Sequence, residues 1–146
     1  DYRLQLYASK SYLARHEPIR ALRDLAAHRF FGYVEELVFS PELRYLSSMV
    51  PDAFTPLRST SVVAQFNAVR EGRGLAVLPC FMANPCSDLV PVLGDEISLL
   101  RTFWIAAPGD IRERARVRAL WDFLREVVEG NQPFLLGQNS QWKSVG

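Results

Sequence analysis

Cysteine and histidine are scarce in this sequence, which has two residues of each kind. Cys80 and Cys86 are too far apart for a C-x-x-C redox or zinc motif. His16 and His28 lie far from both cysteines in the sequence, so no metal-ligand spacing is present. We therefore expect no metal site and no cofactor. We also expect both cysteines to be reduced thiols, with a redox switch as the open alternative.

The sequence also lacks a long apolar run and an excess of one charge. A membrane span needs about 18 or more consecutive apolar residues, which are not found here, and no segment has the pattern of a signal peptide. Because 17 basic residues oppose 16 acidic ones, the net charge of +1 cannot hold the chain on nucleic acid. We therefore expect no membrane partner and a cytoplasmic location. The first residue, Asp1, is not an initiator methionine, which suggests a truncated or processed chain.

The apolar content is sufficient for one folded domain, because 49% of the 146 residues are hydrophobic. Strand-like segments alternate with helix-like segments, which predicts an α/β fold. The expected strands cover residues 4–8, 29–34, 75–78, 89–93 and 97–107. Pro91 inside the fourth of them confines that strand to a sheet edge or a bulge.

Helical spacing of apolar residues, with capping residues in front and glycines behind, predicts the helices. They are expected near residue 10, at residues 21–25 and 41–49, from residue 62 to the glycines at 72 and 74, around residue 81, and at residues 113–129. The last helix is the clearest, with an apolar stripe of Val117, Leu120, Trp121, Leu124, Val127 and Val128. Residues 131–146 lack periodicity, so we expect poor order there, although Phe134-Leu135-Leu136 could dock locally.

Several segments, taken in order, resemble the sensing domain of bacterial LysR-type transcriptional regulators. The pattern most specific to the family's ligand cleft is Leu57-Arg58-Ser59-Thr60-Ser61, followed by Ala68-Val69-x-x-Gly72-x-Gly74-Leu75-Ala76-Val77-Leu78-Pro79. Two more segments that look like the family are Leu6-Tyr7-Ala8-Ser9-x-x-Tyr12-Leu13 and Leu22-x-Asp24-Leu25-x-x-His28-Arg29. The family's winged helix-turn-helix, linker helix and first strands have no counterpart here.

The resemblance implies a fold like that of type 2 periplasmic binding proteins, in which a mixed sheet flanked by helices forms each of two lobes. Residues 1–7 would be a hinge strand from lobe one, and residues 8–105 the effector-binding lobe two. Residues 106–130 would form a return strand and a lobe-one helix, and residues 131–146 a flexible tail. The resemblance further implies a small-molecule effector, DNA contact only through a missing N-terminal winged helix-turn-helix, and a homo-oligomer.

Within this frame, Ser59, Thr60 and Ser61 stand before the helix that begins at residue 62. A helix N-terminus exposes unpaired N–H groups and carries positive partial charge. One serine could simply cap the helix, and this is the open alternative. Because three hydroxyl residues stand together, we favour a carboxylate or phosphate site.

Three further residues are candidates for ligand contact. Tyr33 and Val34 end a strand that would point to the same cleft, where open α/β sheets usually bind ligands. Phe81 follows an apolar strand and could wall the pocket. A core position is the alternative for Tyr33 and for Phe81.

Enzymatic functions have less support from the residues. Nothing in the sequence shows that the adjacent carboxylates Glu35-Glu36 and Asp95-Glu96 converge on a pocket, as acid–base chemistry requires. Cys80 has no marked partner base, and no G-x-S-x-G motif is present. We therefore expect a non-enzymatic sensor of a small anionic or polar metabolite. A solute-binding protein of similar fold, and with less support an enzyme, are the alternatives.

Overall fold

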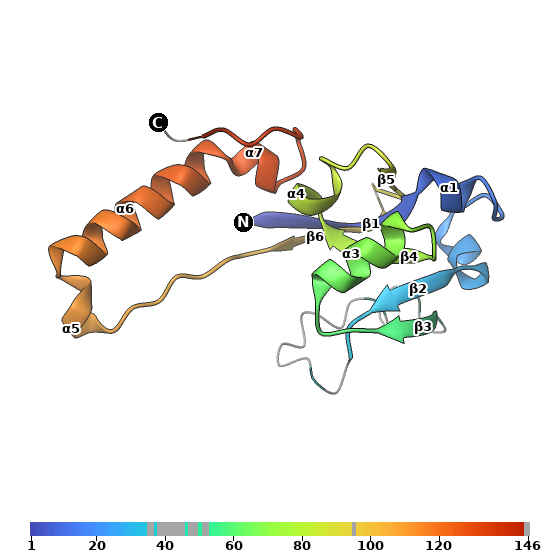
Figure 1. The fold of residues 1–146 in the computed structure, drawn as a ribbon, viewed down its shortest axis with the longest axis horizontal. Coiled ribbons are helices and arrows are strands. Elements are labelled where there is room, and N and C mark those ends of the chain that lie inside the picture. The colour runs from blue at the N-terminus through green and yellow to red at the C-terminus, as the bar shows by residue number, and fades with distance from the viewer. Residues whose placement is uncertain (35–36, 38–45, 47–49, 51–52, 95, 145–146) are drawn as a thin grey trace.

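The computed structural model describes residues 1–34, 37, 46, 50, 53–94 and 96–144. In these residues the centre of the fold is a mixed six-stranded sheet (Figure 1). Five strands follow the order β3-β2-β4-β1-β5, and the sixth strand, β6, pairs with β1 outside this order. The strands are β1 (Tyr2–Ser9), β2 (Arg29–Gly32), β3 (Phe54–Arg58), β4 (Leu75–Pro79), β5 (Leu89–Pro91) and β6 (Ser98–Arg101). The predicted α/β class with a mixed sheet is confirmed.

The sheet is mixed because two groups of strands run in opposite directions. β1 is antiparallel to β4, β5 and β6, whereas β2 is parallel to both β3 and β4. Parallel strands need a connection that crosses over, and α3 (Val62–Arg70) supplies it between β3 and β4. β5, which contains Pro91, lies at the edge of the sheet as predicted.

Central strands β1 and β4 are buried on both faces, and their side chains divide between two cores. Successive side chains of a strand point to opposite faces of a sheet. On one face Leu6 and Val77 belong to a core that also includes Leu25. On the other face Tyr7 and Ala76 belong to a second core, against which residues of α3 pack. β4 is buried along its whole length, as its uninterrupted apolar run predicts.

Capping residues place the short helices as predicted from the sequence. The Ser9 hydroxyl accepts a hydrogen bond from the Tyr12 N–H at 3.2 Å and caps α1 (Lys10–Leu13). The turn after it is a 3-10 helix, η1 (Leu22–Ala27). Gly72 follows α3 with a φ of +69°, a conformation that glycine adopts without a Cβ clash. The helix expected at residues 41–49 lies outside the described residues, apart from residue 46.

The strand expected at residues 97–107 is too long, because β6 ends at Arg101. Pairing explains the difference: Arg101 is opposite Tyr2, the first residue of β1, so the chain beyond Arg101 has no neighbouring strand. Residues 102–108 instead run away from the sheet as an extended segment (Figure 1). Trp104 in this segment is 87% exposed.

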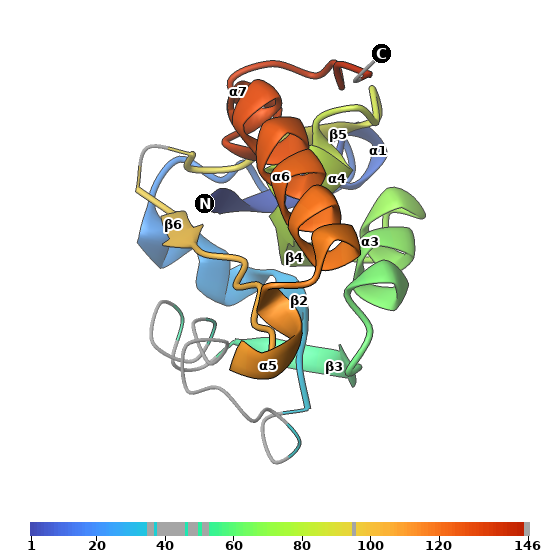
Figure 2. The same ribbon diagram turned by 90° about the vertical axis from the view of Figure 1, so that its left-hand side faces the viewer.

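The extended segment leads to α5 (Gly109–Arg112) and then to α6 (Ala115–Gly130), close to the predicted helix. Figure 1 shows α6 apart from the sheet, Figure 2 views the molecule from that side and shows the same helix in front of the sheet, and no residue of α6 is buried. The chain then returns to the sheet through α7 (Gln132–Leu135), which packs on α4 (Cys80–Ala83). Within the tail for which poor order is expected, Leu135 of α7 is buried, in agreement with the local docking expected for Phe134-Leu135-Leu136. α7 is only one turn long, so its sequence is too short to show the apolar spacing by which a helix is predicted.

Candidate functional site

The hydroxyl triplet Ser59, Thr60 and Ser61 lies between the end of β3 and the start of α3. The Ser59 N–H donates to the Gly32 carbonyl at 2.9 Å, which fixes the triplet to the end of β2. The Ser61 hydroxyl accepts from the Ala64 N–H at 3.4 Å, so Ser61 is the N-cap of α3. Ser59 is half-buried, whereas Thr60 and Ser61 are exposed. The triplet is thus accessible to a ligand.

Part of the hydrogen-bonding capacity of the triplet is already used within the chain. The Ser59 hydroxyl accepts from the Ser61 N–H at 3.1 Å. The N–H groups of Val62 and Val63 lie in the first turn of α3, where the helix provides no backbone acceptor for them. With the Thr60 hydroxyl, they are the donors that a carboxylate or phosphate would meet here.

Gln65 is a positioning residue of this site that the sequence analysis missed. Its side chain is 1% exposed, and its amide Nε2 donates to the Ser59 carbonyl at 3.2 Å. This bond ties the turn that carries the triplet to the second turn of α3. A signal was present in the sequence, because a polar residue lies among the apolar positions Val62, Phe66 and Val69.

Tyr33 and Val34 directly follow β2, which ends at Gly32 and not at residue 34 as expected. β2 and β3 are parallel, with Gly32 paired to Arg58, so the residues that follow both strands meet at the same edge of the sheet. The backbone of Tyr33 and Val34 therefore lies close to the hydroxyl triplet, and both residues are half-buried. The Tyr33 ring packs against the core that contains Leu25, which is the alternative expected for this residue. Burial, with a smaller contribution from Tyr2, raises the pKa of Tyr33. Its phenol is consequently neutral near pH 7 and can donate a hydrogen bond.

Phe81 belongs to a separate aromatic group at the start of α4. Its ring meets that of Tyr2 edge-on, with 5.9 Å between the centroids. Tyr2 in turn stacks on Phe103 at 4.2 Å. Phe81 is half-buried, and none of its described ring contacts involves the hydroxyl triplet. The contribution of Tyr2 and Phe103 is not predictable from the sequence, because a ring contact between distant positions leaves no local pattern.

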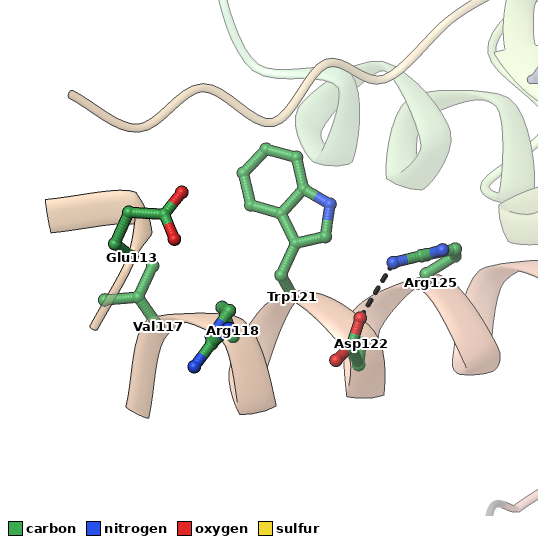
Figure 3. A pocket seen from close by; sticks show the side chains of 6 residues that line it. All are labelled: Glu113, Val117, Arg118, Trp121, Asp122 and Arg125. Carbon is green, nitrogen blue, oxygen red and sulfur yellow. Dashed lines mark hydrogen bonds and ion pairs between the residues drawn. The ribbon is translucent and has the colours of Figure 1, made fainter. Parts of the chain in front are cut away.

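A cavity of about 280 Å³ lies on α6 (Figure 3), and none of the six predicted site residues lines it. Its lining consists of Glu113, Val117, Arg118, Trp121, Asp122 and Arg125. Asp122 and Arg125 form an ion pair at 2.7 Å on the helix surface. The cavity thus combines an indole ring with charged groups of both signs.

The chemistry of the cysteines argues against a thiol nucleophile. Both cysteines are free, and Cys80 is fully buried. Burial raises the pKa of the Cys80 thiol, which keeps it protonated, and its Sγ donates to Gln5 Oε1 at 3.4 Å. In the described part of the chain we find no cluster of three metal-ligating side chains and no helix long and apolar enough to cross a membrane. The pair Glu35-Glu36 and Asp95 lie outside the described residues.

Comparison with known proteins assigns the chain to a family. Residues 1–129 match the family described as LysR substrate binding domain. The chain also resembles the regulatory domain of CrgA, a LysR-type transcriptional regulator from Neisseria meningitidis. This likeness has a TM-score of 0.63 at 20% identity and covers 86% of this chain and 64% of that one. No curated protein sequence matches the chain.

Two further solved structures share the fold. The regulatory domain of HypT from Salmonella typhimurium has a TM-score of 0.58 at 17% identity, with 88% of this chain and 62% of that chain covered. A cysteine-binding protein from Campylobacter jejuni has a TM-score of 0.50 at 12% identity, with 96% and 58% covered. The chain thus spans less than two thirds of the length of these structures, and by its family match it belongs to the LysR substrate-binding domains.

Proposed function

We propose that this chain is the effector-sensing part of a bacterial, cytoplasmic LysR-type transcriptional regulator, without enzymatic activity of its own. The observation that carries the proposal is the common edge of β2 and β3, where Tyr33, Val34 and the hydroxyl triplet meet beside the N-terminus of α3. In this assignment residues 8–105 form the effector-binding lobe. Residues 1–7 and 106–130 belong to the connection with the other lobe, and α6 is part of that other lobe.

The effector that fits this edge is a small anion that also has an apolar or hydrogen-bonding part. Unpaired N–H groups at the start of α3 attract a carboxylate or phosphate. Tyr33 offers a neutral hydroxyl at the same end of the sheet, although its ring packs against the core that contains Leu25. Phe81, in its separate aromatic group with Tyr2 and Phe103, remains a candidate for an apolar contact. Binding shifts the angle between lobes only if the ligand binds one arrangement better than the other. DNA binding by the assembled oligomer then changes with that angle.

Replacement of Ser61 by alanine is expected to weaken effector binding in the intact regulator. Because the cap bond to the Ala64 N–H is also lost, stability should fall by about 1 kcal/mol, which must be measured separately. Thermal shift with a panel of small carboxylates and phosphate monoesters would first identify a ligand, and calorimetry would then compare the variants. Ser61→Asp separates the two effects, because aspartate keeps the cap but repels an anion. An affinity unchanged in both variants, with the fold intact, would leave Ser61 only its capping role.

The isolated chain is expected not to bind operator DNA specifically. Its net charge is +1, and it has no counterpart of the family's DNA-binding head. In a mobility-shift assay, any retention of DNA should be independent of sequence and should disappear as salt is raised. A shift that depends on sequence and resists salt would contradict this assignment. The intact regulator serves as the positive control.

The intact regulator is proposed to be a homo-oligomer, as the family resemblance implies. The apolar stripe of α6 bears instead on self-association of this chain, which in this assignment contains only part of the two lobes. Val117, Trp121, Leu124 and Val127 are only half-buried in the isolated chain, and Leu120 is 57% exposed. An apolar surface of this extent on one helix is unusual for a soluble monomer.

A further inference from the structure

Four basic side chains from three separate elements converge on one pocket at the far end of the sheet. Arg15 and His16 follow α1, Arg29 begins β2, and Arg73 follows α3. Tyr12 and Gly72 complete the lining of this cavity of about 220 Å³. The three arginines carry three positive charges, although the whole chain has a net charge of only +1. We call this feature the arginine pocket.

The structural role of Arg15 is evident, but it does not account for the other two arginines. Arg15 Nε donates to the Ser11 carbonyl at 2.9 Å, and Arg15 Nη2 donates to the Gly72 carbonyl at 3.4 Å. Arg15 thus joins α1 to the turn after α3. Arg29 and Arg73 are exposed, and their guanidinium groups make no hydrogen bond or ion pair to the described residues. Fold stability therefore does not require these two charges.

Ordered side chains form the wall behind these arginines. The Tyr12 hydroxyl accepts a hydrogen bond from the backbone N–H of Arg29 at 3.3 Å, and its oxygen lies 3.1 Å from His28 Nδ1. Burial, and then the nearby His16, lower the pKa of His28 and so favour its neutral ring. The Tyr12 hydroxyl and His28 Nδ1 share a hydrogen bond whose direction is set by the tautomer of that ring. The His16 ring stacks on Tyr12 at 3.8 Å between centroids, and His16 Nδ1 lies 2.8 Å from the Tyr12 carbonyl. The wall is therefore held in place on both sides.

Carboxylates near the pocket do not neutralise it. Glu17 and Glu71 are close in sequence, but both are exposed and neither lines the pocket. Asp24 accepts from the N–H groups of Arg20 and Ala21 and lies 3.7 Å from Arg23. The pocket lining itself contains no acidic residue. Guanidinium groups that face one cavity repel each other, and an anion between them would relieve that repulsion.

From these observations we propose that the arginine pocket is a second ligand site, which binds a small anion with two or more negative charges. Arg29 and Arg73 supply planar donors that suit carboxylate and phosphate oxygens. Either a phosphate group or a polycarboxylate presents this chemistry, and the cavity is large enough for one such group.

This site is distinct from the proposed effector site at Ser59–Ser61. The triplet precedes the N-terminus of α3, whereas Gly72 and Arg73 follow its C-terminus. A helix of nine residues is about 14 Å long, so the two sites lie at opposite ends of it. Figure 1 shows α1 and the start of β2 at the end of the sheet that is remote from α6.

The proposal is tested by NMR. The isotope-labelled chain is titrated with inorganic phosphate and, in a separate experiment, with citrate, and chemical shifts are followed. Saturable shifts are expected at the amides of Gly72 and Arg73 and at the His16 ring. The double variant Arg29→Gln/Arg73→Gln should lower the affinity by about tenfold or more, because it removes two charge-assisted contacts. Arg116→Gln/Arg118→Gln on α6 is the matched control, with the same change of charge, and should bind as the parent chain does.

Comparison of the two affinities shows whether the pocket prefers a phosphate group or a polycarboxylate. Absence of saturable shifts at the pocket with both ligands would overturn the proposal, as would equal losses of affinity in the two double variants. Shifts confined to Ser61 and Val62 would report the proposed effector site instead and would also overturn it. The wild-type titration decides this point even if a variant fails to fold.

Discussion

Replacement of Gly74 by alanine is expected to lower the free energy of unfolding by about 3 kcal/mol, because the added methyl group meets backbone atoms. A Cβ at Gly74 would lie 2.6 Å from the Arg29 carbonyl oxygen and 3.1 Å from the Phe31 ring. Rotation of a side chain cannot relieve a contact with a carbonyl group. The pairing of β2 with β4, which starts at Phe30 and Leu75, would have to open instead.

Chemical denaturation followed by circular dichroism measures this loss. Gly130→Ala is the matched control, because a Cβ at this exposed end of α6 meets nothing within 4 Å. Its stability should remain unchanged or rise slightly, since alanine favours the helix. A Gly74→Ala chain as stable as the Gly130→Ala chain would mean that β2 and β4 are not as closely apposed as described.

Local signals explain why much of the fold could be predicted from the sequence. Ser61 caps α3 because a hydroxyl beside a helix start accepts a backbone N–H, and this depends on neighbouring residues alone. Gly72 ends α3 for an equally local reason, its positive φ. The buried strand β4 was evident from an apolar run between a glycine and a proline. The family resemblance depends on these segments together with residues 6–13 and 22–29.

Features that depend on distant residues could not be predicted. The length of β6 is set by where β1 begins to pair, and no pattern within residues 97–107 shows that. Gln65 is a partial exception, because a polar residue among apolar positions is visible in the sequence, but its acceptor, the Ser59 carbonyl, is not. Phe81 meets aromatic partners from β1 and from the extended segment. Convergence of Arg29 and Arg73 on one pocket likewise follows from the topology of the sheet.

Self-association of the chain through α6 is the second large effect that we expect. The apolar stripe predicted from the sequence is present on α6, and no residue of this helix is buried. Burying a side chain of this kind is worth about 1.5–3 kcal/mol, so several of them together favour a covering surface over exposure to water. Arg118, Asp122 and Arg125 flank the stripe along one border, where they line a cavity together with Val117 and Trp121. The helix therefore has a defined apolar side that a second copy of the chain can cover.

Leu120→Glu/Leu124→Glu tests this, because both leucines belong to the stripe while neither is needed in a buried core. Loss of two such side chains from the contact should raise the dimer dissociation constant by about a hundredfold or more in sedimentation velocity. Ala115→Glu/Ala119→Glu adds the same charge to exposed positions on the opposite side of α6 and should leave association unchanged. Because a symmetric pair places the same patch of both copies in contact, each substitution acts twice. A parent chain that stays monomeric at high concentration would show that α6 does not bind a second copy. If Ala115→Glu/Ala119→Glu weakened association as much as the leucine variant does, added charge and not loss of the apolar stripe would explain the weakening.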